Sequence, residues 1–174
     1  MDTMIFVNLP VSDLERSKEF YAKLGFPNDP AFSDENGSSV VISKTIWLML
    51  LTKPFFKTFT SNELADTTRT SAAIIGLSAD SREAVDALAD KAFAAGAGKS
   101  QDPMDQGFMY SRSFADPDGH LFEIIWMDPA AAQVDPFRPL PIRPEPAQVD
   151  QRFGTFAAAL RPQMGRNVDH LQPG

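Results

Sequence analysis

The sequence contains no cysteine and only two histidines, His120 and His170, among its 174 residues. The lack of cysteine excludes disulfides, thiolate metal sites and a cysteine nucleophile. A Ser-His-Asp triad would need one of the two histidines, and neither has a supporting context. Gly-rich phosphate loops and Gly-x-Ser-x-Gly elbows are also missing. A chain without cysteine suits the cytoplasm, where we expect this protein.

Long apolar runs and an excess of positive charge are absent as well. No apolar run approaches the roughly 18 residues of a membrane span, so we expect no membrane partner. The first residues lack a basic segment before a long apolar one, so no secretory signal is expected. The sequence has 16 Lys and Arg and 23 Asp and Glu, which gives a net charge of -7. Such a surface is a poor partner for nucleic acid, and a neutral or cationic small molecule suits it better.

The first part of the chain predicts a strand, a helix and a β-hairpin. The expected ranges are 4–11 for the strand, about 12–24 for the helix, and 39–43 and 45–51 for the hairpin. Ser12 and Glu15 form a capping box that would start the helix, and Gly25 is suited to end it. Residues 30–38 are predicted to be polar turn.

The second part repeats this order of elements. A strand is expected at 72–77, a helix from about 80 to 95, and strands at 108–114 and 120–126. Either Asp80 or Ser81 would cap the helix. An internal repeat of about 65 residues predicts an α+β fold of two βαββ modules, about residues 4–52 and 71–127. Together they would form a curved mixed sheet around a cleft.

The C-terminal part differs in composition. Six prolines between residues 129 and 146 preclude regular structure there. We therefore predict one domain over residues 1–128 and a Pro-rich C-terminal extension over residues 129–174. A short helix is expected at about 151–160.

The segment 114–126 is the most informative of the chain. Asp-Pro-Asp-Gly at 116–119 is typical of a tight turn between two strands. Glu123 then interrupts an apolar run, and a carboxylate there costs free energy unless it is paired, protonated or bound. Glu123 is therefore either a ligand contact in a cleft or an acid with a hidden partner such as Arg112. His120 is expected to be a surface residue that bonds the turn backbone.

Two motifs carry a resemblance to a known family. Residues 11–26 follow the pattern Val-x-Asp-Leu-x-x-Ser-x-x-Phe-Tyr-x-x-Leu-Gly-Phe, and Asp-Pro-Asp-Gly-His with Glu123 follows about 100 residues later. Over about residues 4–127 the chain resembles the vicinal oxygen chelate superfamily, the glyoxalase/bleomycin resistance protein/dioxygenase family. The resemblance implies two βαββ modules around a cleft, a homodimer, and a metal bound by His or Gln, Glu, His and Glu from four strands.

Carried over to this sequence, the metal positions fall at Phe6, about Met49, near Ala72 and at Glu123. Phenylalanine and alanine cannot coordinate a metal, and a thioether is unsuited to Mg²⁺, Mn²⁺ or Zn²⁺ in such sites. Glu123 is the one ligand retained at a family position, whereas about three protein ligands are normal. We therefore predict no cofactor, with a divalent metal as the alternative.

The candidate ligand-binding residues follow from the same placement. They are Phe6, Asn8, Trp47, Met49, Tyr110, Arg112 and Glu123. The first four would line the cleft because the family's ligand positions point inward, unless they are ordinary core. Tyr110 and Arg112 share a strand face by alternation, and Arg112 could clamp a carboxylate or phosphate.

The sequence favours a small-molecule-binding protein with a degenerate metal site, similar to bleomycin resistance proteins. One alternative is a divalent-metal-dependent lyase or dioxygenase of the same superfamily. The other is a non-catalytic interaction protein that uses its Pro-rich extension to bind a partner. No catalytic residue is predicted, and whether the protein is an enzyme stays open.

Overall fold

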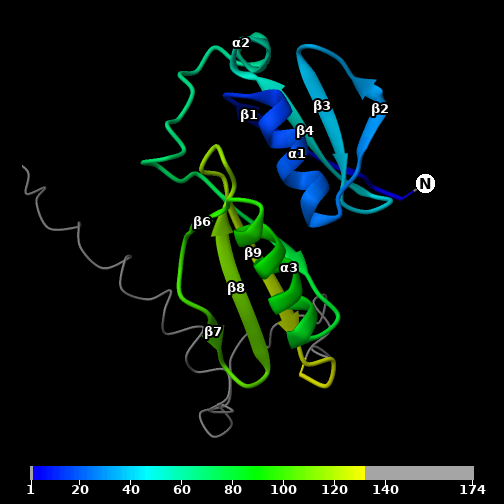
Figure 1. Cartoon of the computed structure of the whole chain (residues 1–174), viewed down its shortest axis with the longest axis vertical. Coiled ribbons are helices and arrows are strands. Elements are labelled where there is room, and N and C mark those ends of the chain that lie inside the picture. Colours follow the sequence, from blue (N-terminus) through cyan, green and yellow to red (C-terminus); the bar gives the residue numbers. More distant parts are fainter. Residues whose placement is uncertain (1, 132–174) are drawn as a thin grey trace, which may run out of the picture. The chain divides into compact units, whose positions relative to one another are not determined.

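A computed structural model describes residues 2–131 of the chain (Figure 1). The first module consists of β1 (Ile5–Val11), α1 (Leu14–Leu24), β2 (Asn28–Ser33), β3 (Gly37–Val41) and β4 (Ile46–Thr52). Its four strands form a sheet in the order β1-β4-β3-β2, in which β1 and β4 are parallel and the other neighbours antiparallel. The predicted α+β class and the β3–β4 hairpin are confirmed.

Strand β2 lies where the sequence predicted polar turn, so the first module is βαβββ and not βαββ. The pairing of β2 with β3 is irregular, and the register shifts between Asp29 and Ser33. Because β2 is an edge strand with mostly half-buried and exposed residues, it needs no alternating apolar pattern. The alternation of apolar and polar residues that predicts a strand is therefore missing from β2.

Helix α1 begins one residue later than the capping box predicted. The carboxylate of Asp13, not the hydroxyl of Ser12, accepts a hydrogen bond from the backbone N–H of Arg16 at 3.0 Å. The backbone N–H of Ser12 donates instead to Asp118. Gly25 ends the helix as expected, with a left-handed φ of 99°.

A short connection leads to the second module. It contains α2 (Lys53–Phe56), a 3-10 turn (Lys57–Phe59) and residues 60–73. We call residues 60–73 the linker. The second module consists of β5 (Ile74–Ser78), α3 (Arg82–Ala94), β6 (Gly98–Lys99), β7 (Met104–Asp105), β8 (Met109–Ala115) and β9 (Leu121–Met127). Ser81 caps α3, accepting from the N–H of Ala84 at 3.1 Å. The sheet has the order β5-β9-β8-β6, with β7 also paired to β8.

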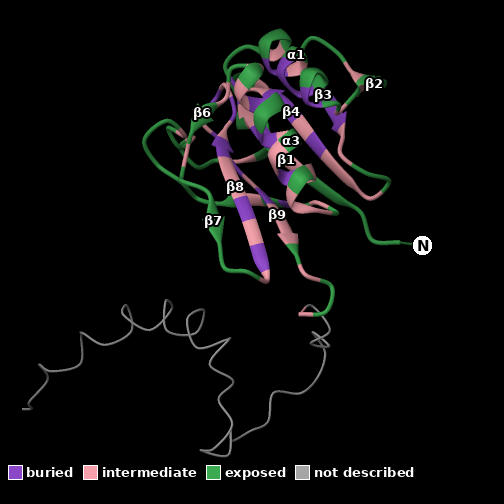
Figure 2. Cartoon of the chain, turned by 60° about the horizontal axis from the view of Figure 1, so that its bottom comes forward, coloured by how far each residue is buried: buried purple, intermediate pink, exposed green. Residues whose placement is uncertain are grey.

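The two sheets are separate hydrogen-bonded units, but one apolar core joins them (Figure 2). Phe20 and Tyr21 on α1 reach the second sheet, where their rings lie 6.2 Å from Phe114 and 5.9 Å from Phe122. All four side chains are almost fully buried. Helix α1 therefore contributes to the core of both modules.

The predicted extension lies outside the described residues, apart from its first three. The helix expected at 151–160 and His170 are also outside them. Within residues 2–131, no helix combines the length and apolar character needed to cross a membrane.

Candidate functional site

The four candidate residues of the first module share one face of its sheet. Phe6 pairs with Trp47, and Asn8 pairs with Met49, across the β1–β4 ladder. Alternating side chains point to opposite faces, so this face is opposite to the one that buries Leu9 in the core. We call it the open face. Its residues are half-buried or exposed, with Phe6 53% exposed.

Aromatic rings cluster on this open face. The ring of Trp47 lies 6.4 Å from that of Phe6 and 6.2 Å from that of Phe32. The indole Nε1 of Trp47 is buried, and no acceptor for it is found within residues 2–131. An unsatisfied buried donor is uncommon and calls for an explanation. Ligand binding by these residues stays a prediction.

Glu123 lies on the corresponding open face of the second sheet. It pairs with Gly76 on β5 and with Ser113 on β8. The buried hydroxyl of Ser111 donates a hydrogen bond of 2.8 Å to its carboxylate. The partner of this carboxylate is therefore a serine hydroxyl, and the alternative in which Glu123 pairs with Arg112 is wrong.

Tyr110 and Arg112 occupy the opposite face, beneath helix α3. The guanidinium of Arg112 lies 3.0 Å from the carboxylate of Asp86 and 2.8 Å from that of Asp90. The Tyr110 hydroxyl also donates to Asp86, at 2.8 Å, and this bond raises the pKa of the phenol. Alternation correctly placed Tyr110 and Arg112 together, but the face they share is covered by α3 and does not carry Glu123.

The residues at the family's metal positions do not fit a divalent ion. Gly76, opposite Glu123, has no side chain, and Met49 and Phe6 offer no oxygen or nitrogen ligand. Ala72 precedes β5 and lies in the linker. Nowhere in the described part of the chain do three or more His, Asp or Glu side chains gather in a way that could hold a metal.

A pocket of about 450 Å³ lies between the first module, the linker and the second module. Residues 7–10 of β1 form one wall, linker residues form another, and Ile75 and residues 119–121 complete it. Both β1 and β5 are edge strands of their sheets. We call this hollow the β1–linker pocket. Of the seven candidate residues, Asn8 alone lines it.

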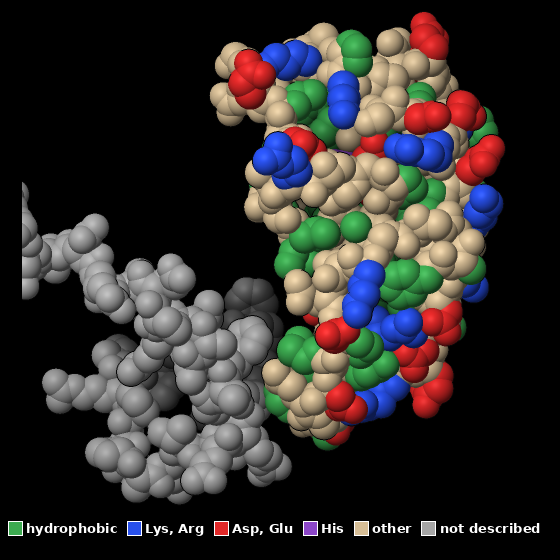
Figure 3. Space-filling model, turned by 60° about the vertical axis from the view of Figure 1, so that its left-hand side comes forward, with side chains coloured by type: hydrophobic (Ala, Val, Ile, Leu, Met, Phe, Trp, Pro, Cys, Tyr) green, Lys and Arg blue, Asp and Glu red, His purple; other side chains and the backbone are tan. Residues whose placement is uncertain are grey.

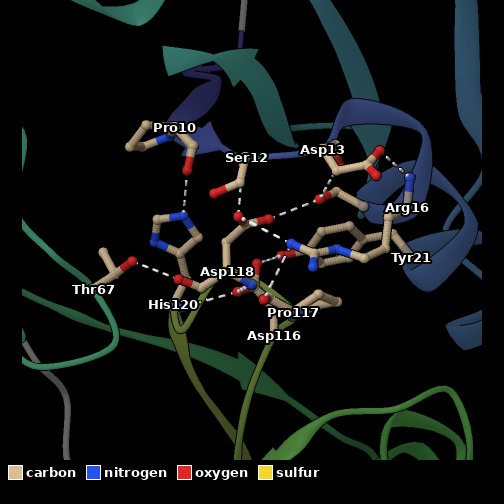
Figure 4. A network of polar contacts seen from close by, with 11 residues as sticks. Pro10, Ser12, Asp13, Arg16, Tyr21, Thr67, Asp116, Pro117, Asp118 and His120 are labelled. Carbon is tan, nitrogen blue, oxygen red and sulfur yellow. Dashed lines mark hydrogen bonds and ion pairs between the residues drawn. The ribbon is translucent and has the colours of Figure 1, made fainter.

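The 116–120 turn holds the second module to the first beside this pocket (Figure 4). Asp118 accepts hydrogen bonds from the backbone N–H of Ser12 at 2.7 Å and from the Ser17 hydroxyl at 2.9 Å, and it pairs with Arg16 at 3.3 Å. Burial raises the pKa of Asp118, but these hydrogen bonds and the Arg16 charge outweigh it, so the net pKa lies below its ordinary value. The carboxylate is thus kept charged.

Asp116 is the second buried acid of the turn. It accepts from the Tyr21 hydroxyl at 2.7 Å and from the backbone N–H groups of Asp118 and His120. Burial raises the pKa of Asp116 above its ordinary value, against the opposing effects of His120 and these hydrogen bonds. Burial also raises the pKa of Tyr21 well above its ordinary value.

His120 is buried and not at the surface, contrary to the sequence expectation. It is 8% exposed, and its Nε2 lies 2.9 Å from the carbonyl oxygen of Pro10. It also lines the β1–linker pocket. Sequence reasoning missed it as a site residue because its partner is 110 residues away. Its place directly after the turn glycine was the one available signal.

Comparisons with known proteins agree with this architecture. The sequence profile of the Glyoxalase/Bleomycin resistance protein/Dioxygenase superfamily matches residues 3–124. Among curated proteins, no sequence matches this chain significantly. Several solved structures are similar to it.

One is a hypothetical protein, SA1046, from S. aureus, with 30% identity, a TM-score of 0.61, and coverage of 72% of this chain and 95% of that one. Another is the ATC0852 protein of Agrobacterium tumefaciens, with 25% identity, a TM-score of 0.56, and coverage of 73% and 98%. A glyoxalase/bleomycin resistance protein/dioxygenase family enzyme of Burkholderia phytofirmans, at 19% identity, a TM-score of 0.61, and coverage of 72% and 99%, shares the fold. The chain therefore belongs to the glyoxalase/bleomycin resistance protein/dioxygenase superfamily.

Proposed function

We propose that this protein binds a small molecule without a metal, in the manner of a bleomycin resistance protein and not of the metal-dependent enzymes of its superfamily. The β1–linker pocket is the observation that carries the proposal. Its volume of about 450 Å³ lies within the range of roughly 300–1,000 Å³ that is usual for ligand sites. Its wall is mainly apolar, with a few polar groups such as His120 and Asn8.

The open face adjoins this pocket through Asn8, which belongs to both. A ligand larger than the pocket would therefore reach Phe6, Trp47 and Met49 next. The Trp47 N–H would supply a donor to such a ligand once the neighbouring rings shift. These residues remain candidates for the outer part of the site.

The donor set argues against the metal-dependent lyase or dioxygenase. That activity would need about three protein ligands on the open faces. Glu123 supplies one carboxylate, which already accepts from Ser111, and its neighbour on β5 is a glycine.

Saturable binding of 2-naphthol, followed by its fluorescence, tests the pocket. Ala73→Trp would fill it, since Ala73 lines the pocket, and we expect binding to weaken at least about tenfold. Ala22→Trp is the matched control, because Ala22 is exposed on α1 and is not part of the pocket wall. Equal binding by both variants, or no saturable binding at all, would refute the proposed site.

A second copy of the chain is the protein partner that we expect. Ile74 is 62% exposed and Met127 is 50% exposed, and both lie on the open face that carries Glu123. Figure 3 shows hydrophobic side chains reaching the surface between charged ones. A second copy that buries these exposed apolar side chains would remove them from water, which is favourable. Sedimentation of the full chain should show a dimer that Ile74→Glu weakens, and a monomeric wild type would contradict it.

A further inference from the structure

The ring of His120 has a defined hydrogen-bonding direction. A carbonyl oxygen can only accept, so Nε2 of His120 carries the hydrogen in its 2.9 Å contact with Pro10. When the ring is neutral, Nδ1 is then an acceptor with a free lone pair. Figure 4 shows Pro10 at the Nε2 end of the ring, with Nδ1 on another edge, directed away from Asp118.

That second nitrogen has no partner in the described part of the chain. The contacts of His120 within residues 2–131 are the bond from Nε2, the backbone bonds of the 116–120 turn and the charge of Asp116. The residue is more than nine-tenths buried, yet it forms part of the pocket wall. Nδ1 is not among the fully buried polar atoms of the described residues, so this acceptor is accessible, and a ligand in the pocket can donate a hydrogen bond to it in place of water.

The rest of the pocket wall limits what that donor can belong to. The pocket-lining residues include no Lys or Arg, and Glu63 is their single carboxylate. Apolar side chains such as Leu64 and Ile75 supply much of the surface. An anionic ligand would lose its hydration without gaining a cation, so negatively charged substrates are disfavoured.

We propose that the ligand is a compact, largely apolar molecule whose neutral hydroxyl or N–H group donates a hydrogen bond to Nδ1 of His120. This inference rests on the proposed function, because it specifies the chemistry of a ligand for the same pocket. The imidazole then acts in recognition, and Pro10 fixes which ring nitrogen faces the ligand.

A matched pair of probes isolates the hydrogen bond. 2-Naphthol carries the hydroxyl, and 2-methoxynaphthalene has the same ring system without the donor. We expect the full chain to bind 2-naphthol roughly three- to tenfold more tightly, as one hydrogen bond predicts. His120→Phe should abolish this preference, whereas Tyr21→Phe, which alters the same polar network away from the pocket, should keep it.

A spectroscopic measurement on the wild type guards against a misfolded His120→Phe. The chain has two histidines, so [¹⁵N]histidine labelling gives four ring-nitrogen signals, two from each imidazole, and His170→Gln identifies the two that belong to His120. The Nδ1 resonance of His120 should shift when 2-naphthol binds. It should not shift in the same way when 2-methoxynaphthalene binds.

The outcomes separate this inference from the proposed function. If both probes bind equally, the Nδ1 signal is unchanged and Ala73→Trp still blocks binding, the pocket is a ligand site but the hydrogen bond to His120 is refuted. If neither probe binds, both the proposed function and this inference are overturned. A preference for 2-naphthol together with the Nδ1 shift supports both.

Discussion

Gly119 joins β8 to β9 through two constraints that glycine alone meets. Its φ is 87°, in the left-handed region, and a Cβ there would lie 2.7 Å from the carbonyl oxygen of Thr67 in the linker. We expect Gly119→Ala to lower the free energy of unfolding by roughly 2–5 kcal/mol, from backbone strain and overpacking together. Urea unfolding of the full chain measures this loss.

Gly107→Ala is the control, because Gly107 has a similar φ of 77° but open space where a Cβ would stand. It should cost about 1–2 kcal/mol, from strain alone. Equal losses for the two variants would mean that the linker does not approach the turn as closely as the structure shows.

Asp118 should make stability depend on pH. Its pKa is held below the ordinary value, so its carboxylate contributes stability above the unfolded-state pKa of about 3.9, and that contribution is lost as pH falls through the lower folded-state pKa. Asp118→Asn should cost about 1.5–3 kcal/mol at pH 7, because the side chain is only 2% exposed and its hydrogen bonds are charge-assisted. The deficit should shrink below about pH 4.

Asp116→Asn is the matched comparison and should show the opposite slope. Burial raises the pKa of Asp116, so its contribution is present below the ordinary carboxyl pKa and is lost as pH rises through the higher folded value. Urea midpoints of both variants and the wild type, measured from pH 3 to 7, give the two slopes. Slopes of the same sign would contradict the assigned pKa directions.

At the scale of elements, Arg82 ties the start of α3 to the second sheet. Its guanidinium pairs with Asp105 at 2.7 Å and lies 5.2 Å and 5.0 Å from the ring centres of Tyr110 and Trp126. The Arg82 hydrogen bond, followed by that from the N–H of Gly107, lowers the pKa of Asp105 to about 2. Arg82→Gln should therefore raise the Asp105 pKa toward its ordinary value.

Carboxyl ¹³C titration by NMR measures that pKa. Arg112→Gln is the control. Arg112 lies beside Tyr110 on the sheet face that α3 covers, but it pairs with Asp86 and Asp90 and not with Asp105. An Asp105 titration unchanged by Arg82→Gln would show that the pair does not persist in solution.

The elements show which features local sequence could predict. Apolar periodicity and capping residues predicted α1, α3 and the paired strands, because these features depend only on residues close together in the sequence. The prediction of Ser12 as the cap of α1 was wrong, and the backbone N–H of Ser12 instead donates to Asp118, 106 residues away. Alternation paired Tyr110 with Arg112 but could not say which face α3 covers. The i,i+4 spacing of Asp86 and Asp90, which faces Arg112, was a missed clue.

At the scale of the whole molecule, the pocket exists because edge strands and a linker meet there. No residue of the pocket belongs to a sequence motif except those of the 116–120 turn, which the sequence indicated as a tight turn and as part of the family motif. Within the turn, Asp118 bonds Ser17 of α1, and His120 bonds Pro10 of β1. A site assembled from such distant segments depends on tertiary contacts, which explains why His120 escaped prediction while Glu123 did not.

The open faces of the two sheets also determine whether the protein carries a metal. Because Glu123 faces Gly76 and already accepts from Ser111, the purified full chain should carry no divalent metal in stoichiometric amount. Its affinity for 2-naphthol should be unchanged by EDTA or by added Mn²⁺ or Zn²⁺. Elemental analysis and the fluorescence titration measure these two quantities.

Glu123→Gln is the informative variant, since it removes the one carboxylate retained at a family metal position. If the carboxylate has only a structural role beside Ser111, the variant keeps the metal content and 2-naphthol affinity of the wild type. About one metal ion per chain, lost in Glu123→Gln, would show that the ligands come from a second copy or from residues beyond 131. The metal-dependent lyase or dioxygenase would then replace the binding protein as the better account, because the metal could polarise a bound oxygen as a Lewis acid.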